Sequence, residues 1–135
     1  IGTNLGDREE NLNAALHLLN ERVGEQLACS SVHRSAPMGF ESENEFANIV
    51  AVYDTPYSPE EVLLITQQIE REMGRTEKSE NCVYHDRIID IDLLQAILNS
   101  KAIIQNSSTL TLPHPRMQER DFVMIPLREV EAILN

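Results

Sequence analysis

Two aspartates, Asp90 and Asp92, stand one residue apart in the aliphatic run Arg-Ile-Ile-Asp-Ile-Asp-Leu-Leu, residues 87–94. If this run is a β-strand, both carboxylates lie on one face, about 6.6 Å apart along the chain. Such a pair suits Mg²⁺, which takes oxygen ligands and bridges protein carboxylates to substrate phosphates. The alternative is a solvated polar face on an edge strand, although like charges on one face repel and Asp is disfavoured in strands. We therefore predict a metal site at these two residues.

Three cationic residues precede or open the acidic run: Arg75, Lys78 and Arg87. Transfer of a phosphoryl group requires positive charge over the negative charge that develops in the transition state. The same side chains could instead pair with neighbouring glutamates on an ordinary solvated surface. Charge alone leaves both interpretations open.

Two further segments carry side chains suited to ligand recognition. Phe46 and Asn48 share one face of a predicted strand, and an aromatic ring beside an amide can bind a flat heterocycle by stacking and edge hydrogen bonds. A packed Phe and a hydrogen-bonded Asn are the structural alternative. His114, Arg120 and Phe122 lie in a predicted loop whose content is typical of binding loops, although a lone histidine there is also compatible with simple exposure.

The composition limits the partners that this chain can have. Its 135 residues are the size of one ordinary domain, so we predict a single domain over residues 1–135 and a monomer. With 22 acidic and 11 basic residues the net charge is −11, which repels nucleic acid and anionic lipid at long range. We therefore predict no nucleic-acid partner and no membrane association. A small anionic ligand stays possible where a metal and arginines overcome this charge locally.

Cysteine, glycine and apolar usage narrow the class further. Cys29 and Cys82 lie far apart without zinc-binding spacing, which indicates a reduced protein of the cytoplasm. The chain holds no apolar run of about 18 residues that could span a membrane, and neither GxxxxGK[ST] nor GxGxxG is present. Side chains and metal would therefore have to hold any nucleotide phosphates. Since the chain begins with Ile1 rather than Met, we expect its first strand and its C-terminal end to be truncated.

Local signals predict the elements that position these residues. Asp7 is a typical N-cap with Glu10 at the third helical position, and Gly24 ends this first helix. Ser58 opens a second helix with a capping box, and Gly74 ends it. Strands are predicted to end at Ile1 and Gly2 and to run over residues 27–35, 46–54, 87–94 and 109–112, with an edge excursion or loop over 99–108 and a closing helix over 126–134.

The resulting order β-α-β-β-α-β is typical of the split βαβ, or ferredoxin-like, arrangement. We predict an α+β fold in which an antiparallel sheet carries both helices on one face, followed by a C-terminal strand and helix. The opposite face of the sheet is then expected to be free for a site.

An ordered series of short segments spans nearly the whole chain, at residues 1–6, 35–39, 46–48, 69–75, 87–92, 112–114 and 120–122. In order and spacing this series resembles the 6-hydroxymethyl-7,8-dihydropterin pyrophosphokinases of folate biosynthesis. The resemblance implies transfer of diphosphate from ATP to the hydroxymethyl group of the pterin, with AMP as the other product. ATP and the hydroxymethyl dihydropterin are then the small-molecule partners.

The same resemblance implies roles for individual residues. Asp90 and Asp92 match ligands of two Mg²⁺ ions that bridge the ATP phosphates, and Arg75 and Arg87 match arginines of a loop that closes over the phosphates. The positions implied for ATP binding are Gln67, Glu70, Lys78, Leu93, Thr111, His114 and Arg120. The positions implied for the pterin are Ser35, Ala36, Met38, Phe46, Asn48 and Phe122, with the two phenylalanines on either side of the ring and the asparagine at its edge.

The residues themselves, without the resemblance, leave two other functions open. One is a non-catalytic ferredoxin-like module that binds a ligand on its open sheet face. The other is a different metal-dependent phosphotransferase on the same fold.

Overall fold

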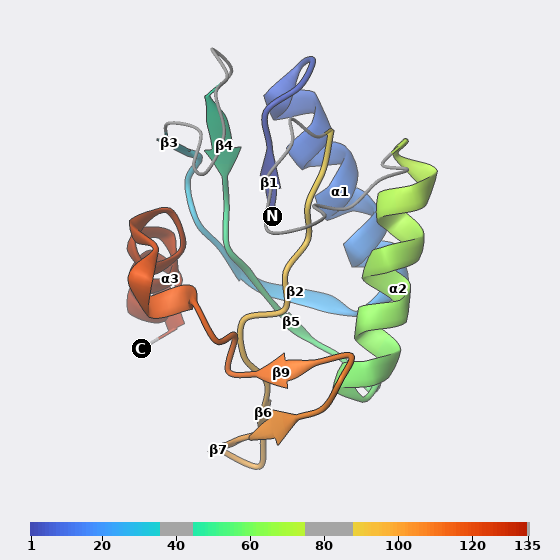
Figure 1. Ribbon diagram of the computed structural model, residues 1–135, viewed down its shortest axis with the longest axis vertical. Helices are drawn as coiled ribbons and strands as arrows, with labels where there is room; N and C mark the ends of the chain where they lie inside the picture. The colour runs from blue at the N-terminus through green and yellow to red at the C-terminus, as the bar shows by residue number, and fades with distance from the viewer. Residues whose placement is uncertain (36–44, 75–87, 135) are drawn as a thin grey trace.

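The computed structural model describes residues 1–35, 45–74 and 88–134, with the side chain of Ser35 outside the description. The fold is α+β, with helices packed around short antiparallel strands (Figure 1). Among the described residues, no helix has both the length and the apolar content needed to cross a bilayer. The helices are α1 (Arg8–Arg22), α2 (Pro59–Glu72) and α3 (Asp121–Leu134), with a short 3-10 helix η1 (Met117–Glu119). The strands are β1 (Gly2–Thr3), β2 (Glu25–Cys29), β3 (His33–Ser35), β4 (Phe46–Asn48), β5 (Ala51–Asp54), β6 (Ile97–Leu98), β7 (Lys101–Ala102), β8 (Gln105–Asn106) and β9 (Thr111–Leu112).

The predicted strands over 27–35 and 46–54 each form as two shorter strands. β4 pairs antiparallel with β1 on one side and β3 on the other, and β5 pairs antiparallel with β2. Ser30 lies between β2 and β3, and Val50 lies between β4 and β5. The Ser30 amide donates to the Val50 carbonyl at 2.8 Å, but the Val50 amide donates to the Ser30 hydroxyl at 3.0 Å. This side-chain bond replaces a backbone rung and interrupts the ladder.

The predicted continuous strand over 87–94 is wrong: among the described residues 88–94, only Asp90 pairs with a strand, as an isolated bridge. Gly2 and Asp90 exchange two backbone hydrogen bonds of 2.8 Å, so Asp90 pairs antiparallel with β1. The next backbone groups bond elsewhere, because the Ile91 amide donates to the Glu70 carboxylate at 2.9 Å and the Leu94 carbonyl accepts the His114 amide at 2.7 Å. The segment therefore leaves the sheet after Asp90.

Both predicted N-caps are confirmed. The Asp7 carboxylate accepts the Glu10 amide at 3.1 Å at the start of α1. Ser58 and Glu61 form the reciprocal capping box of α2, with bonds of 3.2 and 3.3 Å. α1 and α2 lie next to each other in Figure 1 and share an apolar cluster with Ile89 and Ile91. The two helices thus cover one face of the sheet and pack against the acidic segment through Ile89 and Ile91.

α3 covers part of the opposite face, so the prediction that this face is free is wrong in part. Ala47 and Ile49 pack with Leu12 of α1, whereas Val50 packs with Leu127 of α3. Since alternate residues of a strand point to opposite faces, α3 lies across the sheet from α1 and α2, as Figure 1 also shows. The phenylalanine and asparagine of β4 lie on the α3 side of the sheet by the same rule.

The closing helix begins five residues earlier than predicted. Pro126 is a common first helical residue, which favoured a start there. The Arg120 carbonyl instead accepts the amides of Val123 and Met124 at 3.0 and 2.9 Å, so the first turn forms before the proline. The predicted strand over 109–112 is confirmed for Thr111–Leu112 only.

Candidate active site

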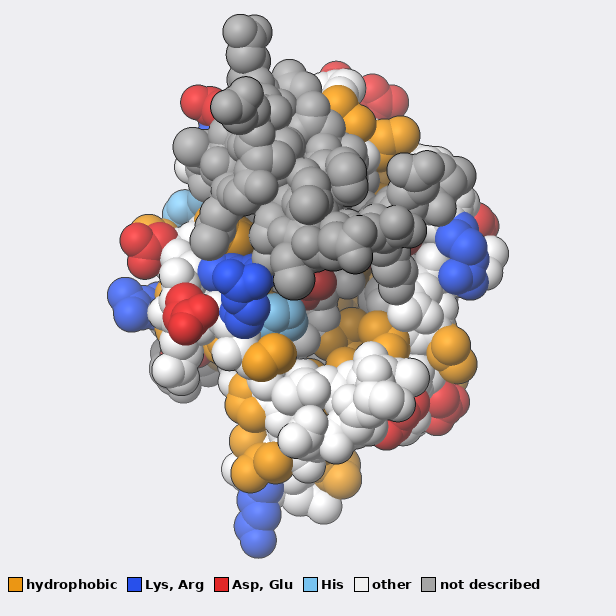
Figure 2. Space-filling model, in the orientation of Figure 1, with side chains coloured by type: hydrophobic (Ala, Val, Ile, Leu, Met, Phe, Trp, Pro, Cys, Tyr) orange, Lys and Arg blue, Asp and Glu red, His pale blue; other side chains and the backbone are white. Residues whose placement is uncertain are grey.

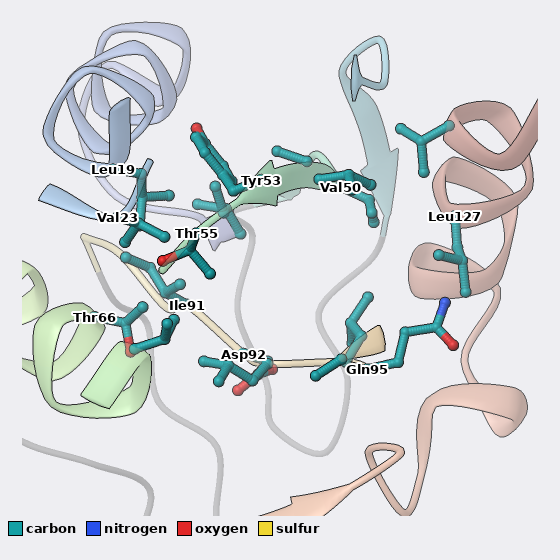
Figure 3. A pocket seen from close by; sticks show the side chains of 18 of the residues that line it. Leu19, Val23, Val50, Tyr53, Thr55, Thr66, Ile91, Asp92, Gln95 and Leu127 are labelled. Atoms are coloured by element: carbon teal, nitrogen blue, oxygen red, sulfur yellow. The ribbon is translucent and has the colours of Figure 1, made fainter. Parts of the chain in front are cut away.

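A cavity of about 990 Å³ lies beside the sheet and reaches the segment that follows Asp90. On the face shown in Figure 2, hydrophobic side chains form the floor of a hollow, with acidic, histidine and basic side chains next to them. Figure 3 shows that the lining side chains come from α1, α2, β5, α3 and the segment around Asp92. The cavity brings together these predicted site residues: Phe46, Asn48, Asp90, Asp92, Leu93, Arg120 and Phe122.

The acidic pair is held through its backbone. Asp90 is bonded to Gly2, and the amide of the intervening Ile91 is bonded to Glu70. The Asp92 side chain is accessible from the cavity, yet loss of surrounding water raises the pKa of its carboxyl and the nearby charge of Asp90 raises it further. Both effects disfavour the charged carboxylate, and a divalent cation bound by the two aspartates would offset both.

The donor set fits Mg²⁺. Within the described ranges no three His, Cys, Asp or Glu side chains gather as a metal-binding group, so the aspartate pair is the candidate. A structural zinc site needs about four protein ligands, whereas Mg²⁺ is usually bound by one or two carboxylates together with waters and substrate phosphates. Two carboxylates open to a cavity match the second pattern.

Glu70 is a buried residue that contacts the backbone between the two aspartates. It is 5% exposed, and its carboxylate accepts the Ile91 amide at 2.9 Å. Glu70 does not line the cavity, and neither do Gln67, Thr111 or His114 among the described residues. His114 is nevertheless close enough for its charge to lower the pKa of Asp92. Of the described positions predicted for ATP, Leu93 and Arg120 therefore line the cavity and the other four do not.

Gly2 is a site residue that the motif analysis missed. A Cβ atom at this position would lie 2.6 Å from Oδ1 of Asn48, well inside contact distance. The glycine therefore leaves room for the Asn48 side chain, which is 8% exposed. A glycine at the end of a predicted strand was the available signal, since glycine within strands often marks a close approach.

Arg120 joins the acidic and aromatic parts of the cavity. Its guanidinium carbon lies 5.6 Å from the centroid of the Phe122 ring, within cation–π distance. Its charge also lowers the pKa of Asp92. Arg120 therefore supports the ring of Phe122 and places a fixed positive charge close to the carboxylates.

Several predicted site residues lie outside the described residues: Ala36, Met38, Arg75, Lys78 and Arg87. For Ser35 only the backbone is described, and it pairs with Phe46 across β3 and β4. The predictions for these residues stay predictions.

An acidic pair suited to Mg²⁺, an adjacent arginine and an aromatic–amide surface define a class: an enzyme that combines a phosphate-bearing nucleotide with a flat heterocycle. The 7,8-dihydro-6-hydroxymethylpterin-pyrophosphokinase family matches residues 1–132 of the chain. The chain belongs to this family, and it transfers pyrophosphate from ATP to hydroxymethyldihydropterin in folate biosynthesis.

Individual relatives agree with this assignment. A 2-amino-4-hydroxy-6-hydroxymethyldihydropteridine pyrophosphokinase of Porphyromonas gingivalis is 48% identical over 135 residues, 100% of this chain and 90% of that protein. The Bacillus subtilis enzyme of the same name is 37% identical over 96% of this chain and 74% of its own length. A mitochondrial folate synthesis bifunctional protein of Pisum sativum is 35% identical over 96% of this chain and 24% of its own length. The family resemblance predicted from the sequence is therefore confirmed, and a non-catalytic module is excluded.

Proposed function

We propose that Asp90 and Asp92 carry the pyrophosphate transfer by holding two Mg²⁺ ions against the ATP phosphates. The observation that carries this proposal is that both aspartates line one cavity, where burial, and after it the charge of Asp90, raises the pKa of the Asp92 carboxyl. Bound Mg²⁺ supplies neutralisation of the phosphate oxygens. The protein's part is to hold the carboxylates at a fixed spacing, which it does through Gly2 and Glu70.

The pterin is proposed to bind at the aromatic end of the cavity. Phe46 and Phe122 stack on its two faces, and the Asn48 amide bonds its edge in the space that Gly2 leaves. Ser35, Ala36 and Met38 complete this end. A flat ring held in this way presents its hydroxymethyl group toward the acidic pair.

ATP is proposed to bind on the acidic side of the same cavity. Leu93 and Arg120 contact it from the cavity wall. Glu70 acts by fixing the Ile91 backbone, and His114 acts from behind the Asp92 segment. The other proposed ATP-binding residues are Gln67, Lys78 and Thr111, with Arg75 and Arg87 placing positive charge over the phosphates during transfer.

The reaction is an in-line displacement. The hydroxymethyl oxygen of the pterin forms a bond to the β-phosphorus of ATP. The bond between that phosphorus and the oxygen shared with the α-phosphate breaks, and this oxygen keeps the electron pair and leaves as part of AMP. The hydroxyl proton passes to solvent. The residues of this chain bind, orient and shield the two substrates, and no covalent enzyme intermediate is needed.

We also propose a sheet topology, a domain organisation, an oligomeric state and a cellular location for this protein. The order Asp90 segment, β1, β4–β5, β3–β2, with antiparallel neighbours, supports a ferredoxin-like sheet. We propose one domain over residues 1–135, acting as a cytoplasmic monomer.

Product analysis tests the proposed reaction. The protein is given Mg²⁺, ATP and hydroxymethyl dihydropterin, and the nucleotide products are separated by anion-exchange chromatography. AMP formed in equal amount to pterin diphosphate is expected for wild type, with near loss of both for Asp92→Asn. ADP as the main product would reject diphosphate transfer.

A further inference from the structure

A carboxylate of α3 binds the turn between β2 and β3. Oε1 of Glu129 accepts the backbone amide of Ser31 at 2.8 Å, and Oε2 accepts the Ser31 hydroxyl at 3.0 Å. The Nε2 atom of His33 lies 2.8 Å from the same Oε2. The side chains of His33 and Glu129 are 29% and 34% exposed, so this pair is half-buried and not a solvated surface pair. These contacts hold the second half of α3 against the sheet.

The turn that Glu129 holds leads directly to Asn48, the residue proposed to bind the pterin edge. His33 is the antiparallel partner of Asn48 across β3 and β4, and the side chains of such partners lie next to each other on one face of a sheet. The next residue, Arg34, contacts Glu9 of α1 at 3.9 Å, as expected for the opposite face. His33 therefore lies between the Glu129 carboxylate and the Asn48 side of the sheet.

A second connection runs through the hydroxyl of Ser30. This hydroxyl accepts the Val50 amide at 3.0 Å and donates to the Ser31 carbonyl at 2.8 Å. The Ser30 amide also donates to the Val50 carbonyl at 2.8 Å. Val50 follows Asn48 by two residues and packs on the α3 side of the sheet. The turn bound by Glu129 is therefore bonded to the chain just beyond Asn48 as well.

Glu129 and Phe122 lie on the same side of α3. Seven residues make nearly two helical turns, so the two side chains project in almost the same direction, about 10 Å apart along the axis. Packing of Val123, Leu127 and Val130 holds α3 on the sheet, but apolar packing is non-directional and does not by itself fix the rotation of the helix. Hydrogen bonds to a carboxylate are directional, so the Glu129 contacts fix this rotation and with it the place of the Phe122 ring.

We propose that Glu129 is a positioning residue for the pterin. By holding the β2–β3 turn, it sets the spacing between Phe122 on α3 and the side chains of Phe46 and Asn48 on β4. A flat ring needs this spacing to be constant, because stacking depends on the distance and offset of the aromatic groups. Glu129 is not among the residues that line the cavity, so it acts through these three residues. The inference rests on the pterin-binding roles proposed for them above.

Steady-state kinetics of Glu129→Ala tests this role. The KM for hydroxymethyl dihydropterin is expected to rise about tenfold, because stacking and edge bonding weaken together, with the KM for ATP within about twofold of wild type. A loss of stability alone would reduce the amount of active enzyme and leave both KM values unchanged. An unchanged KM for the pterin would therefore overturn the proposal.

Glu21→Ala is the matched control. It also removes a contact between a glutamate and a histidine, 3.0 Å from His17, but on an exposed part of α1. It should change neither KM. An equal rise in the pterin KM for Glu21→Ala and Glu129→Ala would overturn a specific role of the α3 carboxylate.

A double-mutant cycle with Phe122 tests how the effect is transmitted. If Glu129 places the Phe122 ring, Glu129→Ala should raise the pterin KM of a Phe122→Ala variant by less than about threefold. Full tenfold rises in both backgrounds would overturn the proposal. A normal pterin KM for Phe122→Ala alone would reject the proposed pterin site as well, whereas a raised KM for Phe122→Ala beside a normal one for Glu129→Ala would reject only the role of Glu129.

A variant with both Ser31→Ala and His33→Ala provides the test if Glu129→Ala does not fold. It removes two of the three groups that contact the carboxylate and leaves the sequence of α3 unchanged. The pterin KM is expected to rise about threefold, because the backbone amide of residue 31 still binds Glu129. A wild-type pterin KM in this variant, shown to be folded by circular dichroism, would overturn the proposal.

Discussion

Substitution of Glu70 distinguishes two possible roles of this residue: holding the backbone of the acidic segment, or binding the nucleotide directly. Glu70→Ala removes the acceptor of the Ile91 amide and leaves that N–H buried beside a 5% exposed position. Leaving this buried amide without its acceptor costs about 1–3 kcal/mol. We therefore expect a loss of about 1–3 kcal/mol in the free energy of unfolding. Glu70→Gln keeps an oxygen acceptor in place, so its loss should be about 1 kcal/mol or less.

The effect on activity follows from geometry. Ile91 stands between the two aspartates, and release of its amide frees both carboxylates to move. A displacement of about 1 Å can lower a rate about 100-fold, and this fall in kcat is expected for Glu70→Ala, with a much smaller change for Glu70→Gln.

Urea unfolding followed by circular dichroism, together with steady-state AMP formation, measures both effects. Glu60→Ala, on an exposed position of α2, is the matched control and should leave both unchanged. A Glu70→Ala variant as stable as wild type would refute a stabilising bond from Glu70 to the Ile91 amide. An equal rise in the KM for ATP in Glu70→Gln and Glu70→Ala would refute this supporting role as well, because a direct contact between Glu70 and ATP would then be the cause.

Three further changes have distinct expected outcomes. Gly2→Ala pushes a methyl group against Asn48 and should raise the KM for the pterin about tenfold, as loss of one hydrogen bond does, with the KM for ATP unchanged in steady-state kinetics. The His33 contact lowers the pKa of Glu129, so this pair stabilises the fold above the ordinary carboxyl pKa and is lost as pH falls through the lowered value. Calorimetry from about pH 6 to pH 3 should therefore show a larger fall in Tm for wild type than for Glu129→Gln, and equal falls would contradict this. Arg75→Ala should lower the single-turnover rate more than it weakens ATP binding, whereas an effect on affinity alone would count against a transition-state role.

Local features could be predicted from the sequence because their physics is local. Asp7 and Ser58 each bond an amide three residues away, so the neighbouring residues alone specify the two helix starts. Phe46, Asn48 and the aspartate pair were selected by the strand alternation, and the structure places all four at one cavity.

Long-range contacts explain what the sequence could not predict. Of the predicted strand over 87–94 only the bridge at Asp90 forms, and it does not continue because the Ile91 amide bonds a side chain 21 residues away on α2. No pattern within the run reveals that acceptor. Likewise, the need for glycine at position 2 depends on Asn48, 46 residues later, and α3 reaches Val50 only through the folded chain.

Mg²⁺-dependent binding of a non-hydrolysable ATP analogue, measured by isothermal titration calorimetry, tests the role of the acidic pair most directly. Wild type should bind the analogue with Mg²⁺ and lose about 100-fold in affinity with EDTA, since metal neutralisation of phosphate is worth several kcal/mol. Asp90→Asn and Asp92→Asn should bind weakly in both conditions, while Glu25→Gln, the same loss of charge at an exposed position of β2, should bind as wild type does. Equal affinity with and without Mg²⁺, or wild-type affinity in both aspartate variants, would contradict a metal site at this pair.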